Sequence, residues 1–214
     1  MGGTTGHNML HTYSTDSAER RYIPFFIAAA GIGATFVVLH VLDRYHVEPP
    51  WWASPPVDTM ALYGLFYWLF DRVIWKWRIL RWLRITRVPD VSGEWHGQAQ
   101  PSTTGGISAG LGAPTDIALS IRQTWTELRV RARTPLSQSH SLSGTFVVAD
   151  DPTLSYEFVN EPSAPAPGTM HAHHGLARLT LNPAHTVFEG EYYSGRDRQN
   201  VGTIRVTRST PRPH

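Results

Sequence analysis

The apolar residues of this chain follow two patterns, with long uninterrupted runs before residue 88 and short alternating segments after it. The first run, residues 23–42, has no charged side chain and is long enough to cross about 30 Å of hydrocarbon at about 1.5 Å per residue. A second apolar run covers residues 57–77, and two Pro-Pro pairs interrupt the chain between the runs. The pattern predicts a hairpin of two transmembrane helices.

From Val91 onward, apolar and polar residues alternate with period two, which is typical of strands with one buried face. Gly, Pro, Asn and Asp separate the segments. We expect an all-β, antiparallel, lipocalin-like small barrel of about eight strands, favoured over a sandwich because about eight strands can close around one small ligand. The predicted strands are residues 93–98, 116–123, 127–134, 139–149, 153–160, 173–181, 186–194 and 202–207.

These patterns divide the chain into four regions. Residues 1–19 are polar and aperiodic, which predicts a flexible tail. Residues 20–88 hold the hairpin with a basic exit, residues 89–208 hold the barrel as a ligand-binding domain, and residues 209–214 form a second tail.

The distribution of charged residues predicts how the hairpin is oriented in the membrane. The formal net charge is only +2, so no global excess of basic residues favours a DNA or RNA partner. The basic residues are instead concentrated on the outer flanks of the two runs, and the positive-inside rule then places both termini and the barrel in the cytosol. A nucleic-acid arm is the weaker interpretation, because it needs no apolar run upstream. The flanking residues are Arg20, Arg21, Lys76, Arg78, Arg81, Arg84 and Arg87.

Polar and aromatic side chains alternate along several predicted strands and are candidates to line a ligand site. Hydroxyl and amide groups suit a polar ligand, a phenol ring suits a base, and arginine forks suit phosphate oxygens. Ordinary edge-strand serines, core packing of aromatic rings and a charged surface hairpin explain the same residues without a ligand. The candidates are Gln123, Trp125, Thr134, Ser139, Ser141, Tyr156, Asn160, His173, Tyr192, Arg196 and Arg198.

Three residues of the apolar runs are candidates for self-association of the hairpin. Ala29 and Gly33 give the first run small side chains that allow close helix contact, although such spacings also arise by chance. Asp71 is costly inside hydrocarbon unless it is paired or faces protein. It pairs with Arg72 near the inner boundary, or it lies between neighbouring subunits.

Metal and catalytic chemistry find little support in the sequence. There is no cysteine, which excludes disulfides and thiolate sites. His171, His173 and His174 are too close together for a zinc site, because adjacent residues of a strand point to opposite faces. No nucleophile, phosphate-loop or dinucleotide motif is present, so we expect a protein that is not an enzyme and has no metal or cofactor.

The order of several short segments resembles a known family, from about Arg20 to Arg208. The segments follow the paired apolar runs and are SGEWHG (92–97), IRQTWTELRV (121–130), T-x-x-S-x-S-x-S (134–141), YEFVNEP (156–162), HHG (173–175) and EGEYYSGRDRQNVGTI (189–204). They resemble the membrane effectors of bacterial CBASS anti-phage systems, which are CD-NTase-associated proteins with two transmembrane helices and a β-strand-rich, SMODS-associating barrel domain.

The resemblance implies a function. The barrel would bind a cyclic dinucleotide made by a CD-NTase, with no direct contact to that enzyme required. Homo-oligomerisation of the helices in the bacterial inner membrane would then disrupt the bilayer and cause abortive infection. The candidate contact residues come from strand phase and not from the resemblance.

Two other functions remain open at this stage. A membrane-tethered binder of a small apolar metabolite would have a barrel interior without Arg196 and the serine row. A structural membrane adaptor would have a barrel filled by its own side chains.

Overall fold

The computed structural model describes residues 10–48, 55–102, 113–148, 151–163, 171–195 and 201–209. The chain divides into two compact units. One unit combines residues 1–16 with residues 88–214, and the other is formed by residues 17–87.

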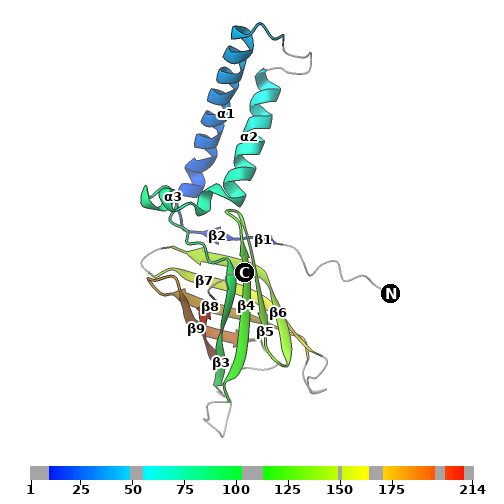
Figure 1. The fold of residues 1–214 in the computed structure, drawn as a ribbon. Helices are drawn as coiled ribbons and strands as arrows, with labels where there is room; N and C mark the ends of the chain where they lie inside the picture. Colours follow the sequence, from blue (N-terminus) through cyan, green and yellow to red (C-terminus); the bar gives the residue numbers. More distant parts are fainter. Residues whose placement is uncertain are drawn as a thin grey trace, which may run out of the picture. The chain divides into compact units, whose positions relative to one another are not determined.

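A closed barrel of eight antiparallel strands forms the larger unit (Figure 1). Each strand pairs with the next in sequence, and the last pairs with the first, so the sheet closes on itself. Closure confirms the predicted barrel over the sandwich, and the eight predicted strands agree with the observed ones to within a few residues at each end. The strands are β3 (Gly93–Ser102), β4 (Thr115–Gln123), β5 (Glu127–Arg133), β6 (Ser137–Val147), β7 (Thr153–Pro162), β8 (His173–Leu181), β9 (Val187–Ser194) and β10 (Val201–Arg208).

Large apolar side chains fill one end of this barrel, which we call the packed end. Trp95 lies against Phe188 with ring centroids 4.7 Å apart, and its Nε1 donates to the Val91 carbonyl at 3.1 Å. Alternation along the strands brings further fully buried side chains inward at this level. They are Leu119, Ile121, Leu128, Phe146, Leu154, Leu179 and Leu181.

A short N-terminal segment completes the barrel at the packed end. Strands β5 and β6 pair directly over only three residue pairs, Arg131–His140 to Arg133–Gln138. Where they diverge, β1 (His11–Thr12) pairs with the start of β5 and β2 (Ser14–Thr15) pairs with the end of β6. Residues 11–15 therefore fill the seam between the two strands.

This segment differs from the flexible tail expected through residue 19. Tyr13 is 4% exposed and belongs to the barrel core, and Ser14 Oγ lies 2.8 Å from Thr145 Oγ1. Asp16 adds a hydrogen bond, accepting from the Val148 amide at 2.8 Å. The burial of one aromatic ring and these hydrogen bonds offset the entropy of ordering the segment.

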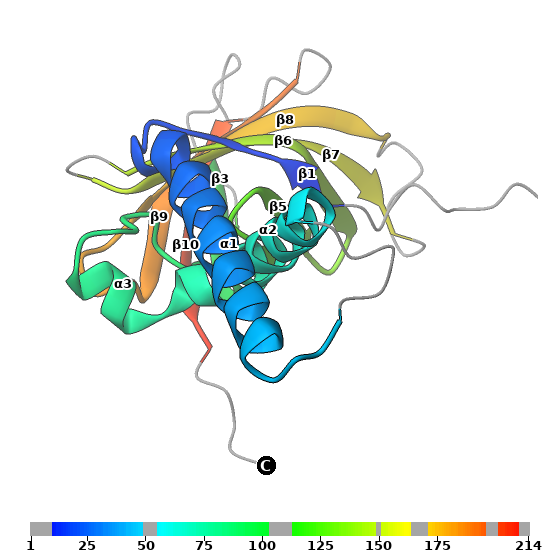
Figure 2. The same ribbon diagram turned by 90° about the horizontal axis from the view of Figure 1, so that it is seen from above.

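The smaller unit contains two long helices packed side by side, α1 (Glu19–Arg44) and α2 (Pro55–Arg72) (Figure 2). The contact face of α1 repeats every four residues and consists of Ile23, Ile27, Gly31 and Thr35. A Cβ at Gly31 would lie 3.4 Å from the Tyr63 amide nitrogen, and Thr35 Oγ1 lies 3.0 Å from Thr59 Oγ1. A small residue and a hydroxyl pair thus hold the helices close together.

Among the described residues, α1 alone is long and apolar enough to cross a membrane by length and composition. The second apolar run was predicted to be helical to residue 77, but α2 ends at Arg72. Val73 leaves the helical region at φ −130°, and a 3₁₀ turn, η2 (Ile74–Lys76), follows. Trp77 is extended and separates η2 from the five-residue α3 (Arg78–Trp82). The basic segment therefore consists of short pieces rather than a continuous helix.

Candidate functional site

The barrel is hollow at the end opposite its packed end, where a cavity of about 270 Å³ opens. Its walls come from all eight strands, at the end where β3, β5, β7 and β9 finish and β4, β6, β8 and β10 begin, and from the turn between β5 and β6. The lining residues are Ala99, Pro101, Thr115, Ile117, Ala132, Thr134, Leu136, Ser137, Ser139, Tyr156, Phe158, Asn160, His173, Tyr192, Ser194 and Ile204.

The cavity exists because the inward positions at this end carry smaller side chains. On β5, the inward residues change from Leu128 and Val130 at the packed end to Ala132 in the cavity wall. On β3 they change from Trp95 to Ala99. Small side chains cannot meet across a barrel of this size, so space remains between the walls.

Two aromatic rings of the wall pack closely against glycines of the neighbouring strand. A Cβ at Gly175 would lie 2.4 Å from Phe158 Cζ, and a Cβ at Gly202 would lie 2.4 Å from a ring carbon of Tyr192. Only glycine permits this close approach. The rings therefore occupy the wall and leave the centre of the cavity open.

Several polar groups of the cavity make no hydrogen bond with any described residue. They include the hydroxyls of Ser139, Tyr156 and Tyr192 and the side-chain amide of Asn160. Burial raises the pKa of Tyr156 well above its usual value and also raises the pKa of Tyr192, so both rings carry neutral phenols at physiological pH. Polar groups left unpaired in a cleft are available to a polar ligand.

Six of the residues selected from strand phase line this cavity: Thr134, Ser139, Tyr156, Asn160, His173 and Tyr192. Thr134 already has protein partners, since its Oγ1 lies 3.0 Å from Ser137 Oγ and accepts from the Ser137 amide at 3.0 Å. His173 Nδ1 donates to the His171 carbonyl at 3.1 Å, which leaves Nε2 as an acceptor in the neutral ring.

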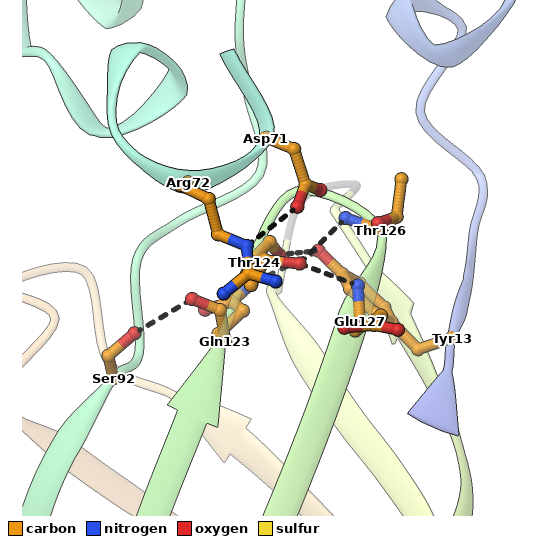
Figure 3. A network of polar contacts seen from close by, with 8 residues as sticks. All are labelled: Tyr13, Asp71, Arg72, Ser92, Gln123, Thr124, Thr126 and Glu127. Carbon is orange, nitrogen blue, oxygen red and sulfur yellow. Dashed lines mark hydrogen bonds and ion pairs between the residues drawn. The ribbon is translucent and has the colours of Figure 1, made fainter. Parts of the chain in front are cut away.

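Gln123 and Trp125 do not line the cavity; they lie at the packed end. Gln123 Oε1 accepts from the Val91 amide at 2.9 Å. Its Nε2 donates to Tyr13 Oη at 3.2 Å, and both of these residues are drawn in Figure 3. Trp125 is 2% exposed in the tight turn between β4 and β5. The Thr124 amide donates to the Glu127 carbonyl at 2.8 Å and closes this turn.

Ser141 is also a structural residue. Its Oγ accepts from the Val130 amide at 2.9 Å and lies 2.7 Å from His11 Nε2. His11 Nδ1 donates to the Thr12 carbonyl, so the Ser141 hydroxyl donates to Nε2. A bulge between Ser141 and Ser143 accompanies this contact. Ser141 therefore replaces a missing strand-to-strand hydrogen bond at the seam.

The remaining candidates are in other places. Arg196 and Arg198 lie outside the described residues. Ala29 and Gly33 are on an exposed face of α1 that does not contact α2, and a Cβ at Gly33 would meet open space. Asp71 lies in the last turn of α2, where its carboxylate is 3.6 Å from Arg72 Nε (Figure 3).

No group of three or more metal-ligating side chains occurs among the residues that the structure describes. As the strand pattern predicted, His173 and His174 point to opposite faces. His173 lines the cavity, while His174 Nδ1 lies on the outer face, 3.9 Å from Glu157 Oε1.

Comparison with known families adds the decisive observation. Residues 86–208 match the family model described as "Cap15, cyclic dinucleotide receptor domain", which covers more than half of the chain. The chain belongs to the Cap15 family. Residues 21–76 match a second model, described as "Cap15, TM helices". The chain is also similar to CD-NTase-associated protein 15 of Yersinia aleksiciae, at 27% identity over 197 residues, or 88% of this chain and 89% of the relative.

Membership in the Cap15 family confirms the resemblance found in the sequence. The family joins a cyclic dinucleotide receptor domain to TM helices, consistent with a CBASS membrane effector. The receptor-domain match spans the whole barrel and so includes every residue that lines the cavity.

The sequence did not point to the apolar part of the Cap15 cavity wall. Ala99, Ile117, Ala132 and Ile204 were not selected, because an inward apolar residue has the same pattern whether it meets another side chain or an open space. The change from large to small inward residues along β3 and β5 is the signal that would have found two of them.

Proposed function

We propose that this chain is a cyclic-dinucleotide-activated membrane effector. In this account the barrel binds the product of a CD-NTase in its cavity, and copies of the chain then associate through their helices in the bacterial inner membrane. The assembled helices disrupt the bilayer, which ends the infection together with the infected cell. The chain acts without catalysis and needs no cofactor.

The observation that carries the proposal is a cavity in which several polar groups lack partners among the described residues, within the matched receptor domain. A cyclic dinucleotide has two bases, two sugars and two phosphates. Aromatic rings at the wall suit the bases, and hydroxyl and amide groups suit the sugar and phosphate oxygens. The proposed contacts are Thr134, Ser139, Tyr156, Asn160, His173 and Tyr192, with Arg196 and Arg198 proposed as phosphate contacts.

The two other functions find less support in this geometry. An apolar metabolite would leave Ser139, Asn160 and Tyr192 unpaired after desolvation, which costs binding free energy. A purely structural adaptor would gain stability from filling the barrel, and a cavity of about 270 Å³ costs stability instead.

We propose that both helices cross the membrane, with the termini and the barrel in the cytosol. The segment after α2 has the composition of an interfacial anchor, because Trp77, Ile79 and Trp82 are more than half exposed and lie beside basic residues. Arg78 and Arg84 are exposed as well, which suits contact with anionic headgroups.

The unequal lengths of the helices suggest how the bilayer is disrupted. In α1, residues 22–42 give 21 uncharged positions, about 32 Å of helix. In α2, Asp58 and Asp71 enclose 12 uncharged positions, residues 59–70, or about 18 Å. A short span is accommodated by thinning the bilayer or by oligomerising, and many copies together would concentrate the strain.

Ligand binding is tested by titrating full-length protein in detergent micelles with a panel of cyclic di- and trinucleotides, using calorimetry. We expect saturable binding of at least one cyclic dinucleotide at micromolar concentration or below. If no member of the panel binds at high micromolar concentration, the receptor function is wrong for this chain.

Self-association is tested with two matched glycine substitutions. Gly33 in α1 and Gly64 in α2 both face open space, so leucine fits at either position in the single chain. We expect Gly33→Leu to lower ligand-dependent dye leakage from inner-membrane-lipid vesicles by at least about tenfold, because it prevents close helix approach. Gly64→Leu is the control and should leak like the wild type. Equal leakage from wild type and Gly33→Leu would remove Gly33 from the proposed interface.

A further inference from the structure

The least exposed residues of the cavity lining, which we call the deep part, differ in character from the rest. Seven lining residues are less than 10% exposed, and five of them are apolar: Ala99, Ile117, Ala132, Phe158 and Ile204. The sixth, Ser137, already shares its hydroxyl with Thr134 at 3.0 Å. The seventh is Tyr156, so its hydroxyl is the only polar group without a partner among the described residues of the deep lining.

Tyr156 is 3% exposed, and its ring is tilted at 52° to that of Phe158, with centroids 6.1 Å apart. A buried phenol usually has a hydrogen-bond partner, because an unpaired hydroxyl is costly away from water. No described residue provides one here. The hydroxyl lines the cavity, so it is free to pair with a ligand group that enters and displaces water.

The surroundings restrict what that group can be. A phosphate is unfavourable among alanine and isoleucine side chains, since none of the residues lining the deep part is a cation to offset its charge. A sugar has several hydroxyls, and a single phenol cannot pair them all. A nucleobase has apolar faces and a polar edge, which matches apolar walls with one hydrogen-bonding group. Phe158 packs closely against Gly175 of the neighbouring strand, which keeps its ring at the cavity wall.

We propose that the deep half of the cavity is a subsite for one nucleobase of the cyclic dinucleotide, and that the Tyr156 hydroxyl determines which base is preferred. The neutral phenol pairs with a heteroatom on the edge of the inserted base. The sugar, the phosphates and the second base stay at the polar mouth beside Ser139, Asn160, His173 and Tyr192. This inference rests on the proposed function and adds the residue that reads the base.

The test compares Tyr156→Phe with Tyr192→Phe in full-length protein. Both substitutions remove one phenol hydroxyl and keep the ring, but one acts in the deep part of the cavity and the other at its mouth. Affinities are measured by calorimetry for cyclic dinucleotides that differ in a single base. A thermal melt of each variant provides the control for folding.

We expect Tyr156→Phe to weaken binding of the preferred ligand by about tenfold, the usual size of one hydrogen bond. Tyr156→Phe should also reduce, by about the same factor, the ratio of the affinity for the preferred ligand to the affinity for its single-base analogue. Tyr192→Phe should weaken both ligands equally and leave the ratio unchanged. On the ligand side, a base analogue that lacks the edge heteroatom should bind wild type weakly but lose nothing further with Tyr156→Phe.

The outcomes separate this inference from the function on which it rests. If wild type binds a cyclic dinucleotide but Tyr156→Phe keeps the wild-type ratio, the base subsite is wrong and the receptor function stands. The edge heteroatom can also be removed from the ligand. If its removal lowers affinity by the same factor in Tyr156→Phe as in wild type, the two groups do not interact and the subsite is also wrong. If wild type binds no cyclic dinucleotide, the proposed function itself fails.

Discussion

The two ends of the barrel are built from the same eight strands, yet they differ in how their interior groups are satisfied. At the packed end, Trp95 and Phe188 fill the space, and buried polar atoms such as Gln123 Nε2 and Ser141 Oγ have protein partners. At the cavity end, Tyr156 and Tyr192 have hydroxyls that no described residue satisfies. The packed end therefore supports the fold, and the cavity end gives up stability to bind a ligand.

The largest effect is expected from Trp95→Ala, which empties the packed end. Trp95 is fully buried and loses both its contact with Phe188 and its hydrogen bond to the Val91 carbonyl. The free energy of unfolding should fall by about 3–5 kcal/mol. Urea unfolding monitored by circular dichroism measures it. Tyr192→Ala, a half-buried ring in the cavity wall, is the control and should cost clearly less; an equal cost would contradict the contrast between the ends.

The second effect concerns the seam that residues 11–15 fill. The chain has no cysteine, so Ser14→Cys with Thr145→Cys introduces a single possible disulfide across a 2.8 Å hydroxyl contact. Oxidation should raise the free energy of unfolding by about 2–4 kcal/mol and leave ligand affinity unchanged. Melts with and without reductant provide the comparison. Failure of the disulfide to form would show that this segment is not inserted in the seam.

A smaller effect separates two serines on the same face of β6. Ser141→Ala leaves the Val130 amide without its acceptor, which should lower the free energy of unfolding by about 1–3 kcal/mol. Ser139→Ala removes a hydroxyl with no partner among the described residues, so stability should hardly change while ligand affinity falls. Chemical denaturation and calorimetry of both variants test the pair. If Ser139→Ala lowered stability and Ser141→Ala lowered ligand affinity instead, Ser139 would be the structural residue and Ser141 the ligand contact.

The smallest effect is a loss of stability in alkali. Burial raises the pKa of Tyr156 in the folded protein, so folding favours the neutral phenol. Its stabilising contribution is complete below the unfolded pKa of about 10 and is lost as pH rises above that value, by at most about 1.4 kcal/mol per pH unit. Tyr156→Phe should flatten the decline in the urea midpoint between pH 9 and 11. An unchanged decline would show that Tyr156 does not resist ionisation.

The strand pattern was sufficient to predict the barrel and six of the sixteen residues that line the cavity. The alternation in residues 153–160 placed Tyr156 and Asn160 on the inward face, where the structure has them. The alternation along a strand shows which side chains point inward, but it does not show which inward polar groups have hydrogen-bond partners in the protein. Gln123 and Ser141 have the same alternation as the cavity residues, but they are paired with Tyr13 and His11, more than a hundred positions away in the sequence.

The sequence patterns also did not predict the N-terminal segment or the end of α2. Strands β1 and β2 have two residues each, too few to show any period, and they gain order only from pairing with β5 and β6. The apolar run continues past Arg72, so composition gave no sign that the helix ends there. Only the backbone at Val73 and Trp77 reveals the break.

The central claim, that the cavity end is the receptor site, is tested most directly by blocking it. Ser139→Trp places an indole in the cavity, whereas Ser143→Trp places the same group at an exposed position of the same strand. Both full-length variants are titrated with the cyclic dinucleotide that the wild type prefers. We predict that Ser143→Trp binds like the wild type and that Ser139→Trp loses binding; wild-type affinity in Ser139→Trp would place the ligand elsewhere and contradict the account.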